Sequence, residues 1–217
     1  MLKMFVDCLN GCQRRDPAES EGPSWRGFGV FWQNLSGHLT ALMKWREVVV
    51  MVTVLILAGG KSTRMGQDKA MMRGGVERLV AVARDAGIQR IITLCGAVER
   101  SSLFEGEVWP DPASCESLMD VIRWVIREVG DEIQFIPCDA FQLEVSGLKA
   151  LISSQGGVPL DSNAMRQPLL ARCPADWMPK LDANNILSMF ADLASLDMGK
   201  YTGQMSNFNS PEAMSAG

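Results

Sequence analysis

A short stretch near residue 60 combines glycines and basic side chains in the way that a phosphate-binding loop requires. An apolar run continues there into the sequence Leu57-Ala58-Gly59-Gly60-Lys61-Ser62-Thr63-Arg64-Met65-Gly66-Gln67-Asp68-Lys69. Adjacent glycines let a ligand approach the backbone without meeting a Cβ atom, and successive amide N–H groups in such a loop form an anion site. The local charge is +3, four minus one, from Lys61, Arg64, Lys69 and Arg73 against Asp68. The loop therefore predicts a triphosphate site, with a solvated basic turn as the alternative.

Two other phosphate-binding motifs do not fit this loop. A P-loop needs a glycine, four residues and then Gly-Lys followed by Ser or Thr, but here Gln67 follows Gly66. A dinucleotide-binding fingerprint needs glycines at positions i, i+2 and i+5, and Gly59, Gly60 and Gly66 do not have that spacing. Both of these nucleotide-binding classes are therefore excluded.

A carboxylate suited to Mg²⁺ follows a later apolar segment. Residues 132–136 have the composition of a buried strand, and Pro137-Cys138-Asp139 comes directly after them. Mg²⁺ takes one or two carboxylates together with phosphate oxygens, so Asp139 is the predicted metal ligand. The alternative is that Asp139 caps the helix that follows. Cys138 has no general base beside it and is interpreted as a small buried residue.

Alternating strand and helix patterns must position these residues. The run 51–57 has β-branched residues on both faces, which is typical of a strand in a parallel sheet. Further strands are predicted at 90–95, 132–136 and 169–171, and helices at 76–86, 115–129, 145–152 and 186–194. This alternation predicts a three-layer, Rossmann-like α/β fold, with a mostly parallel sheet and helices on both faces. Ligands bind beyond the carboxyl ends of such strands, where the loop and Asp139 both lie.

The chain is expected to have two parts. Residues 1–50 show no helical or strand period, and we expect them to form a loosely ordered N-terminal extension. Residues 51–217 then form the domain that carries the chemistry, and Met51 could be its true start.

Composition limits the classes of partner and the compartment. A net charge of −4 argues against a nucleic-acid partner. The longest apolar stretch, 48–58, is too short for a bilayer, which needs about 20 residues, so no membrane partner is expected. The six cysteines are dispersed and no signal-peptide pattern precedes them, which favours reduced thiols in a cytoplasmic protein.

The glycine-rich loop resembles the opening signature of the molybdenum-cofactor guanylyltransferase-like (MobA-like) NTP transferases. That signature is Leu-Ala-Gly-Gly, a variable residue, Ser, a variable residue, Arg-Met-Gly, a variable residue and Asp-Lys, and residues 57–69 match every fixed position. The resemblance extends from about residue 51 to residue 214 and leaves residues 1–50 unexplained. It implies a nucleotidyltransferase that uses Mg²⁺, with GTP as donor and molybdopterin as acceptor.

The resemblance also implies a role for each matching residue. The nucleotide would be bound by Leu57, Ala58, Gly59, Gly60, Lys69, Asp111 and Asp139. The catalytic residues would be Arg64, Lys69 and Asp139, with Asp139 on the metal. Asp111 corresponds to a mid-chain aspartate of the family, although an Asp-Pro pair could simply start a turn. Asn207 and Asn209 match a late motif, although Ser210-Pro211-Glu212 beside them is also an ordinary helix start.

One segment departs from the family pattern. The family usually has Gly-Pro-Leu-Ala-Gly after the mid-chain aspartate, whereas residues 112–120 contain no glycine. Glu116 lies in this segment, and a carboxylate there could accept hydrogen bonds from guanine, which predicts GTP over CTP. Cytidylyl transfer, nucleotidyl transfer to a sugar phosphate, and a catalytically silent nucleotide-binding protein are the alternatives.

Overall fold

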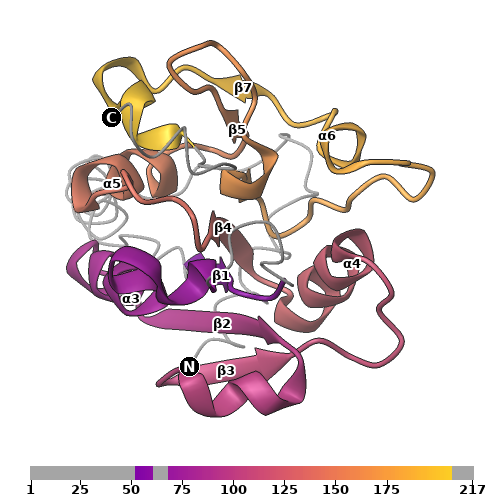
Figure 1. The fold of residues 1–217 in the computed structure, drawn as a ribbon. Coiled ribbons are helices and arrows are strands. Elements are labelled where there is room, and N and C mark those ends of the chain that lie inside the picture. The colour runs from indigo at the N-terminus through magenta and orange to yellow at the C-terminus, as the bar shows by residue number, and fades with distance from the viewer. Residues whose placement is uncertain (1–51, 61–67, 207–217) are drawn as a thin grey trace, which may run out of the picture. The chain divides into compact units, whose positions relative to one another are not determined.

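A five-stranded sheet forms the centre of the computed structural model, which describes residues 52–60 and 68–206 (Figure 1). The strands are β1 (Val52–Leu57), β2 (Arg90–Gly96), β3 (Glu107–Pro110), β4 (Glu132–Pro137) and β6 (Arg172–Cys173). Their order is β3-β2-β1-β4-β6, and only the pairing of β4 with β6 is antiparallel. The prediction of a mostly parallel sheet is confirmed.

The direction of strand addition reverses at β1. The chain adds β2 and then β3 on one side of β1, and returns to place β4 on the other side. Leu57 at the end of β1 is in register with Leu94 on β2 and with Pro137 on β4, so the loops after these strands start at one edge. This reversal creates a switch point between β1 and β4, where ligands bind in open α/β sheets.

Helices cover both faces of the sheet, as predicted. Helices α3 (Gly75–Asp85) and α5 (Val145–Ile152) lie on one face, and α4 (Leu118–Val129) lies on the other (Figure 1). Every residue of β1 is buried, because its alternating side chains enter two separate apolar clusters. Val54 and Ile56 belong to the cluster of α3 and α5, and Leu55 and Leu57 to that of α4. Each such buried side chain contributes roughly 1.5–3 kcal/mol of hydrophobic stabilisation.

Helix α4 begins later than its apolar pattern predicts. Ser117 and Asp120 form a capping box, in which each side chain accepts a hydrogen bond from the other residue's backbone N–H. The helix therefore starts at Leu118 rather than near residue 115, and it ends at Gly130 with a left-handed φ of 64°. The segment between Asp111 and α4 is consequently a loop.

The region after α5 differs from the prediction. Pro168 opens a 3-10 helix, η4 (Pro168–Leu170), where a strand was expected at 169–171. The strand β6 starts only afterwards, because Arg172 and Cys173 are the residues that pair with β4. The predicted helix at 186–194 is also too long, since α6 covers only Ile186–Met189. Phe190 leaves that helix and stacks on Trp177, with ring centroids 5.0 Å apart.

Three further short strands were not predicted. β5 (Val158–Pro159) and β7 (Ser195–Leu196) form a separate two-stranded parallel sheet, and β3 extends the main sheet. Strands β5 and β7 have two residues each and β3 has four, which is too few for an alternating pattern to identify them in the sequence.

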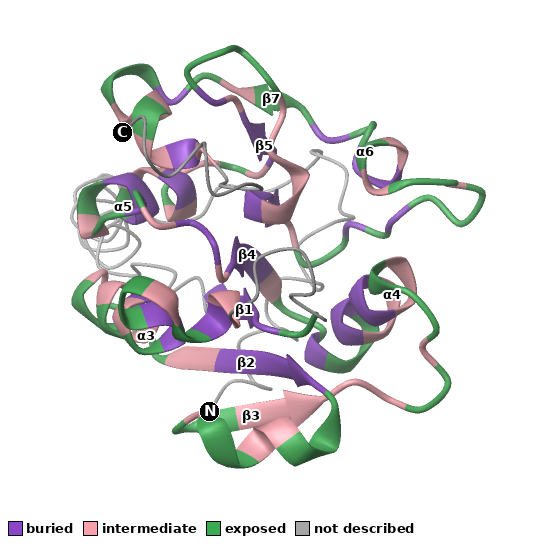
Figure 2. Ribbon diagram, viewed as in Figure 1, coloured by how far each residue is buried: buried purple, intermediate pink, exposed green. Residues whose placement is uncertain are grey.

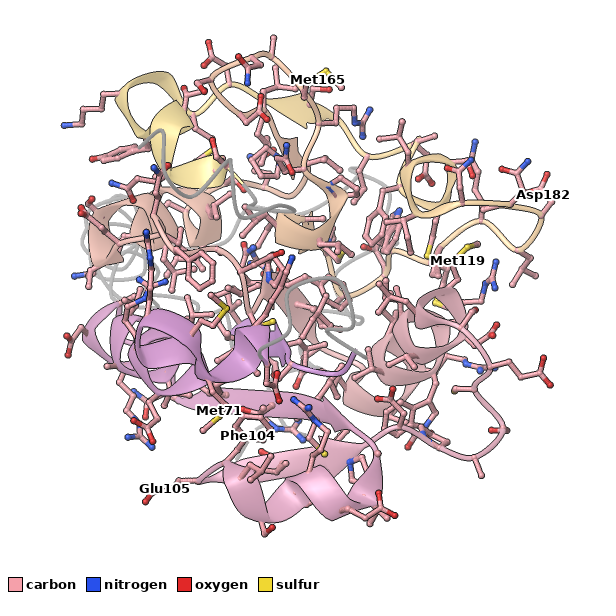
Figure 3. All side chains as sticks on the ribbon, in the orientation of Figure 1. Met71, Phe104, Glu105, Met119, Met165 and Asp182 are labelled. Atoms are coloured by element: carbon pink, nitrogen blue, oxygen red, sulfur yellow. The ribbon has the colours of Figure 1, made fainter. Side chains whose placement is uncertain are left out.

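Exposure follows the layers of the fold. Figure 2 shows burial concentrated in β1, β2 and β4 and exposure on the outer faces of the helices and the loops. Met165 and Asp182, labelled in Figure 3, are exposed in loops of the C-terminal region. In the part of the chain that the structure describes, no helix has the length and apolarity needed to cross a bilayer. The four cysteines of that part, Cys95, Cys115, Cys138 and Cys173, form no disulfide.

Candidate functional site

Two glycines bring the carboxyl ends of β1 and β2 into close contact. A Cβ atom added to Gly59 would lie 3.0 Å from the Cα and N atoms of Gly96 and 3.5 Å from Oδ2 of Asp111. Gly96 has a φ of +79°, a conformation that side chains other than glycine's disfavour. The exposed residue Gly59 therefore lies directly beside the carboxylate of Asp111, and Gly60, also exposed, follows it.

Lys69 and Asp139 meet across the switch point. Lys69 opens the 3-10 helix η2 (Lys69–Gly74), and its Nζ lies 3.0 Å from Oδ2 of Asp139, which follows β4. Both side chains are mostly buried, with 18% of the Lys69 side chain and 12% of the Asp139 side chain exposed. The structure thus joins two residues that lie 70 positions apart in the sequence.

Asp68 fixes the start of η2 and is held in turn by Arg100. Oδ1 of Asp68 accepts a hydrogen bond of 3.0 Å from the backbone N–H of Ala70, which caps η2. Oδ2 of Asp68 accepts one of 2.6 Å from Nη1 of Arg100. Arg100, on the 3-10 helix η3 (Val98–Leu103), also donates to the carbonyl of Ala58 in the glycine-rich loop.

The segment that carries Asp139 is anchored by a second arginine, Arg78. Arg78 on α3 donates hydrogen bonds of 2.7 Å to the carbonyl of Ala140 and 2.8 Å to that of Leu143. The N-cap position of α5 is Glu144, so Asp139 does not cap that helix and its carboxylate is available for another role. The alternative interpretation of Asp139 as a helix cap is therefore wrong.

Cys138, interpreted from the sequence as a small buried residue, is partly buried beside Asp139 and packs against the apolar cluster of α3 and α5. Burial, together with the neighbouring Asp139 carboxylate, raises the pKa of the Cys138 thiol to about 12. A thiol with that pKa stays protonated near neutral pH, and the thiolate is the nucleophilic form. Cys138 is thus not suited to covalent catalysis.

The carboxylate of Asp111 includes an unsatisfied hydrogen-bond acceptor. Its backbone N–H donates to the carbonyl of Gly96 at 2.7 Å, which holds the residue at the end of β3. Its Oδ1 atom is buried and has no hydrogen-bond partner within the described residues. Burial raises the pKa of the Asp111 carboxyl above its ordinary value, because the charged form loses hydration. A cation or a donor group of a ligand would relieve this penalty.

The donor set at this edge fits Mg²⁺. The described residues contain no group of three or more His, Cys, Asp or Glu side chains that could hold a metal by themselves. Mg²⁺ is usually held by one or two carboxylates and completed by phosphate oxygens and water. Asp139 is the carboxylate that such an ion would use here, and the unpartnered oxygen of Asp111 remains for the nucleotide or for water.

The structure brings together the predicted residues that it describes. Leu57, Ala58, Gly59, Gly60, Lys69, Asp111 and Asp139 all lie at the carboxyl edge of the sheet. Arg64, Asn207 and Asn209 fall outside the described residues. Sequence reasoning missed the contributions of Gly96, Arg78 and Arg100. Only Gly96 carried a signal, as a glycine directly after an apolar strand.

The loop without glycines, residues 112–117, projects most of its side chains into solvent. Ala113, Ser114 and Glu116 are exposed, whereas Cys115 packs against the α4 cluster. Glu116 directly precedes the N-cap residue Ser117, so it is not a residue of the helix.

Comparisons with known proteins agree with this architecture. The family model described as the MobA-like NTP transferase domain matches residues 54–191. A protein of Synechococcus elongatus named "Probable molybdenum cofactor guanylyltransferase" is 30% identical over 134 residues, which cover 58% of this chain and 67% of that protein. A molybdenum cofactor guanylyltransferase of Xanthomonas euvesicatoria is 36% identical over 74 residues, or 32% of this chain and 38% of that protein. A solved structure from Aquifex aeolicus has the same fold, with a TM-score of 0.58 at 15% identity, and the match covers 73% of this chain and 93% of that one.

Proposed function

The chain belongs to the MobA-like NTP transferase family, and we propose that it transfers GMP from GTP to molybdopterin with release of pyrophosphate. The observation that carries the proposal is the Lys69–Asp139 ion pair, which lies beside the glycine-rich loop at the switch point of the sheet. A cation for phosphate and a carboxylate for Mg²⁺ are the two groups that this chemistry requires.

The reaction is an in-line displacement at the α-phosphorus. A phosphate oxygen of molybdopterin forms a new P–O bond there, and the bond to the β-phosphate breaks, so pyrophosphate leaves with its electron pair. Such chemistry depends on positioning and on neutralisation of charge rather than on a covalent intermediate with the protein. The protonated thiol of Cys138 agrees with this mechanism.

Each residue of the site has a distinct task in this proposal. The backbone of Gly59 and Gly60 receives the phosphates, and the ammonium group of Lys69, together with Arg64, neutralises charge on the leaving pyrophosphate. Asp139 would hold Mg²⁺, which supplies charge neutralisation for the phosphate oxygens when it is bound. Asp111 lies against Gly59 and uses its unpartnered oxygen for the nucleotide or for water on the metal.

Base choice must come from groups other than the phosphate ligands. Glu116 is exposed in the loop that follows Asp111, and its carboxylate could accept hydrogen bonds from N1–H and the exocyclic amine of guanine. Cytosine offers no such pair of donors on its ring, so we propose a preference for GTP. Competition of GTP, ATP and CTP for the protein and for Glu116→Gln measures this preference, and tighter binding of CTP would contradict it.

Pyrophosphate release from a panel of triphosphates, with and without molybdopterin, tests the proposed reaction. We expect release that requires GTP, Mg²⁺ and molybdopterin together. Release with CTP in place of GTP would identify a cytidylyltransferase. Release with a sugar phosphate in place of molybdopterin would identify a sugar-phosphate nucleotidyltransferase. Tight triphosphate binding without release under any condition would identify a silent nucleotide-binding protein.

A further inference from the structure

We infer that Arg100 is a positioning residue of this site, because it fixes Ala58, before the two glycines of the loop, relative to the segment that carries Lys69. The inference rests on the proposed function for its catalytic consequence. It deepens that function by adding a residue outside the family signature at 57–69, on a segment that was assigned no role from the sequence.

Arg100 connects three separate segments through one guanidinium group. Its Nε donates 2.9 Å to the carbonyl of Cys95 on β2, and its Nη2 donates 2.9 Å to that of Ala58 after β1. Its Nη1 donates 2.6 Å to Oδ2 of Asp68, the residue that caps η2. The guanidinium also lies 5.8 Å from the ring centroid of Phe104, which is labelled in Figure 3.

These contacts join the described residues on either side of positions 61–67. Ala58 precedes that segment and Asp68 follows it. Because Arg100 binds both residues, it restrains the distance between Ala58 and Asp68. The side chain of Arg100 is only 22% exposed, and that of Asp68 is 29% exposed. A partly buried, charge-assisted hydrogen bond is stronger than an exposed surface ion pair.

The effect reaches Lys69 through the carboxylate of Asp68. One oxygen of Asp68 caps η2 at the N–H of Ala70, and the other binds Arg100, so both oxygens restrain the backbone on either side of Lys69. Lys69 in turn reaches Asp139. Asp68 thus connects Lys69 to the ends of β1 and β2 through Arg100. The position of the Lys69 ammonium group therefore depends on the Asp68–Arg100 hydrogen bond.

Arginine is required here because of its geometry. The planar guanidinium directs its N–H groups along fixed, divergent directions, so Nε, Nη1 and Nη2 can each serve a different acceptor. A lysine at this position would retain the charge near Asp68 but could not hold both carbonyl groups at the same time.

The test compares Arg100→Gln, Arg100→Lys, Asp68→Asn and the double variant Arg100→Gln/Asp68→Asn with the full-length protein. Arg90→Gln is the matched control, because Arg90 also pairs with a carboxylate, Glu107 at 3.1 Å, and lies 5.7 Å from the ring centroid of Trp109. Arg90 starts β2 and is therefore at the opposite end of the strand from the site. Melting temperatures establish that each variant is folded, and Arg100→Lys serves if Arg100→Gln does not fold.

The readouts are pyrophosphate release at saturating triphosphate and hydrogen exchange at the amide of Ala70. We expect Arg100→Gln to lower kcat by about 10²-fold, the size of a small misplacement of a catalytic group, and Arg100→Lys to lower it less. The amide of Ala70 should exchange faster in both variants. The double variant should be no slower in turnover than the more impaired single variant, because both residues act through one contact. Arg90→Gln should match the unmodified protein in both readouts.

Unchanged turnover and unchanged exchange at Ala70 in folded Arg100 variants would overturn the inference, and so would additive losses in the double variant. If the unmodified protein releases no pyrophosphate from any triphosphate, the proposed function fails. The exchange at Ala70 then decides on its own whether Arg100 orders η2.

Discussion

Lys69 and Asp139 form a hydrogen-bonded ion pair, and a magnesium-bound triphosphate would offer each of them a further partner of opposite charge. The phosphates carry negative charge for the ammonium, and the metal ion carries positive charge for the carboxylate. Because the two side chains are mostly buried, neither can be removed without leaving the other charge poorly compensated. Effects on activity and on stability must therefore be measured separately at these positions.

Lys69→Ala should lower turnover by about 10²–10³-fold, the usual consequence of losing one preorganised charge partner. The measurement is pyrophosphate release with GTP, Mg²⁺ and molybdopterin, together with the melting temperature. Lys149→Ala, an exposed lysine on α5, is the control and should leave turnover unchanged. Full turnover in folded Lys69→Ala would remove Lys69 from the mechanism.

Asp111→Asn should stabilise the ligand-free protein near neutral pH while weakening triphosphate binding. The raised pKa of Asp111 means that its ionised form is penalised by burial in the folded state. Below the unfolded-state pKa, Asp111 is protonated in both states and the folded protein incurs no penalty. As pH rises through the folded-state pKa, Asp111 ionises and the folded protein loses stability relative to the unfolded chain. The advantage of Asp111→Asn in urea unfolding should therefore disappear at acid pH, where both forms are neutral.

Asp120→Asn should change the stability of the protein in the opposite direction at neutral pH, and it serves as the control for that experiment. Hydrogen bonds from Ser117 lower the pKa of Asp120, so its contribution to stability is present above the unfolded-state pKa and is lost as pH falls. Asp120→Asn should destabilise the protein at neutral pH and have no effect at low pH. A lower stability of Asp111→Asn at pH 7 would contradict the account of Asp111.

At the scale of elements, the structure separates Asp139 from the helix that follows it. The residues from Ala140 to Leu143 are held by Arg78 on α3, and α5 begins only after Glu144. The carboxylate is therefore positioned by the end of β4 and by its neighbours, and it does not stabilise the start of a helix.

Asp139→Asn should abolish Mg²⁺-dependent turnover and leave the protein folded, because asparagine keeps the shape of the side chain and loses its charge. Isothermal titration with Mg²⁺ and a triphosphate, alongside thermal unfolding, measures both effects. Asp85→Asn, at the exposed end of α3, is the control and should behave like the unmodified protein. A folded Asp139→Asn variant that keeps full Mg²⁺-dependent turnover would remove Asp139 as the metal ligand.

The elements that position the site were predicted from the sequence more completely than the rest. The strands β1, β2 and β4 and the helices α3, α4 and α5 have long apolar repeats, because each of them covers or forms the core. Between residues 153 and 206 the chain is held by contacts such as Trp177 on Phe190, and these leave no periodic pattern. Arg100 was missed for a similar reason: two of its three acceptors, Asp68 and Ala58, lie 32 and 42 positions away in the sequence. The third acceptor, the carbonyl of Cys95, is a backbone group like that of Ala58, so its side chain leaves no signal.

At the scale of the whole molecule, the family match begins at residue 54, just after the start of β1. Residues 1–50 fall outside this match, and we propose that they are an extension without a catalytic task. Deleting them should leave turnover and melting temperature unchanged. The segment contains the aromatic residues Trp25, Phe31 and Trp32, and a large fall in melting temperature would mean that they contribute to stability and that the boundary at residue 51 is wrong.

The most direct test of the account follows the α-phosphate itself. The protein would be incubated with Mg²⁺, molybdopterin and GTP labelled at the α-phosphorus, with Asp139→Asn as the inactive control, and the products would be separated and identified by mass. The account predicts that the label appears in a guanine dinucleotide of molybdopterin while the released pyrophosphate carries none. Label that stays in intact GTP, bound to the protein but never transferred to molybdopterin, would contradict it.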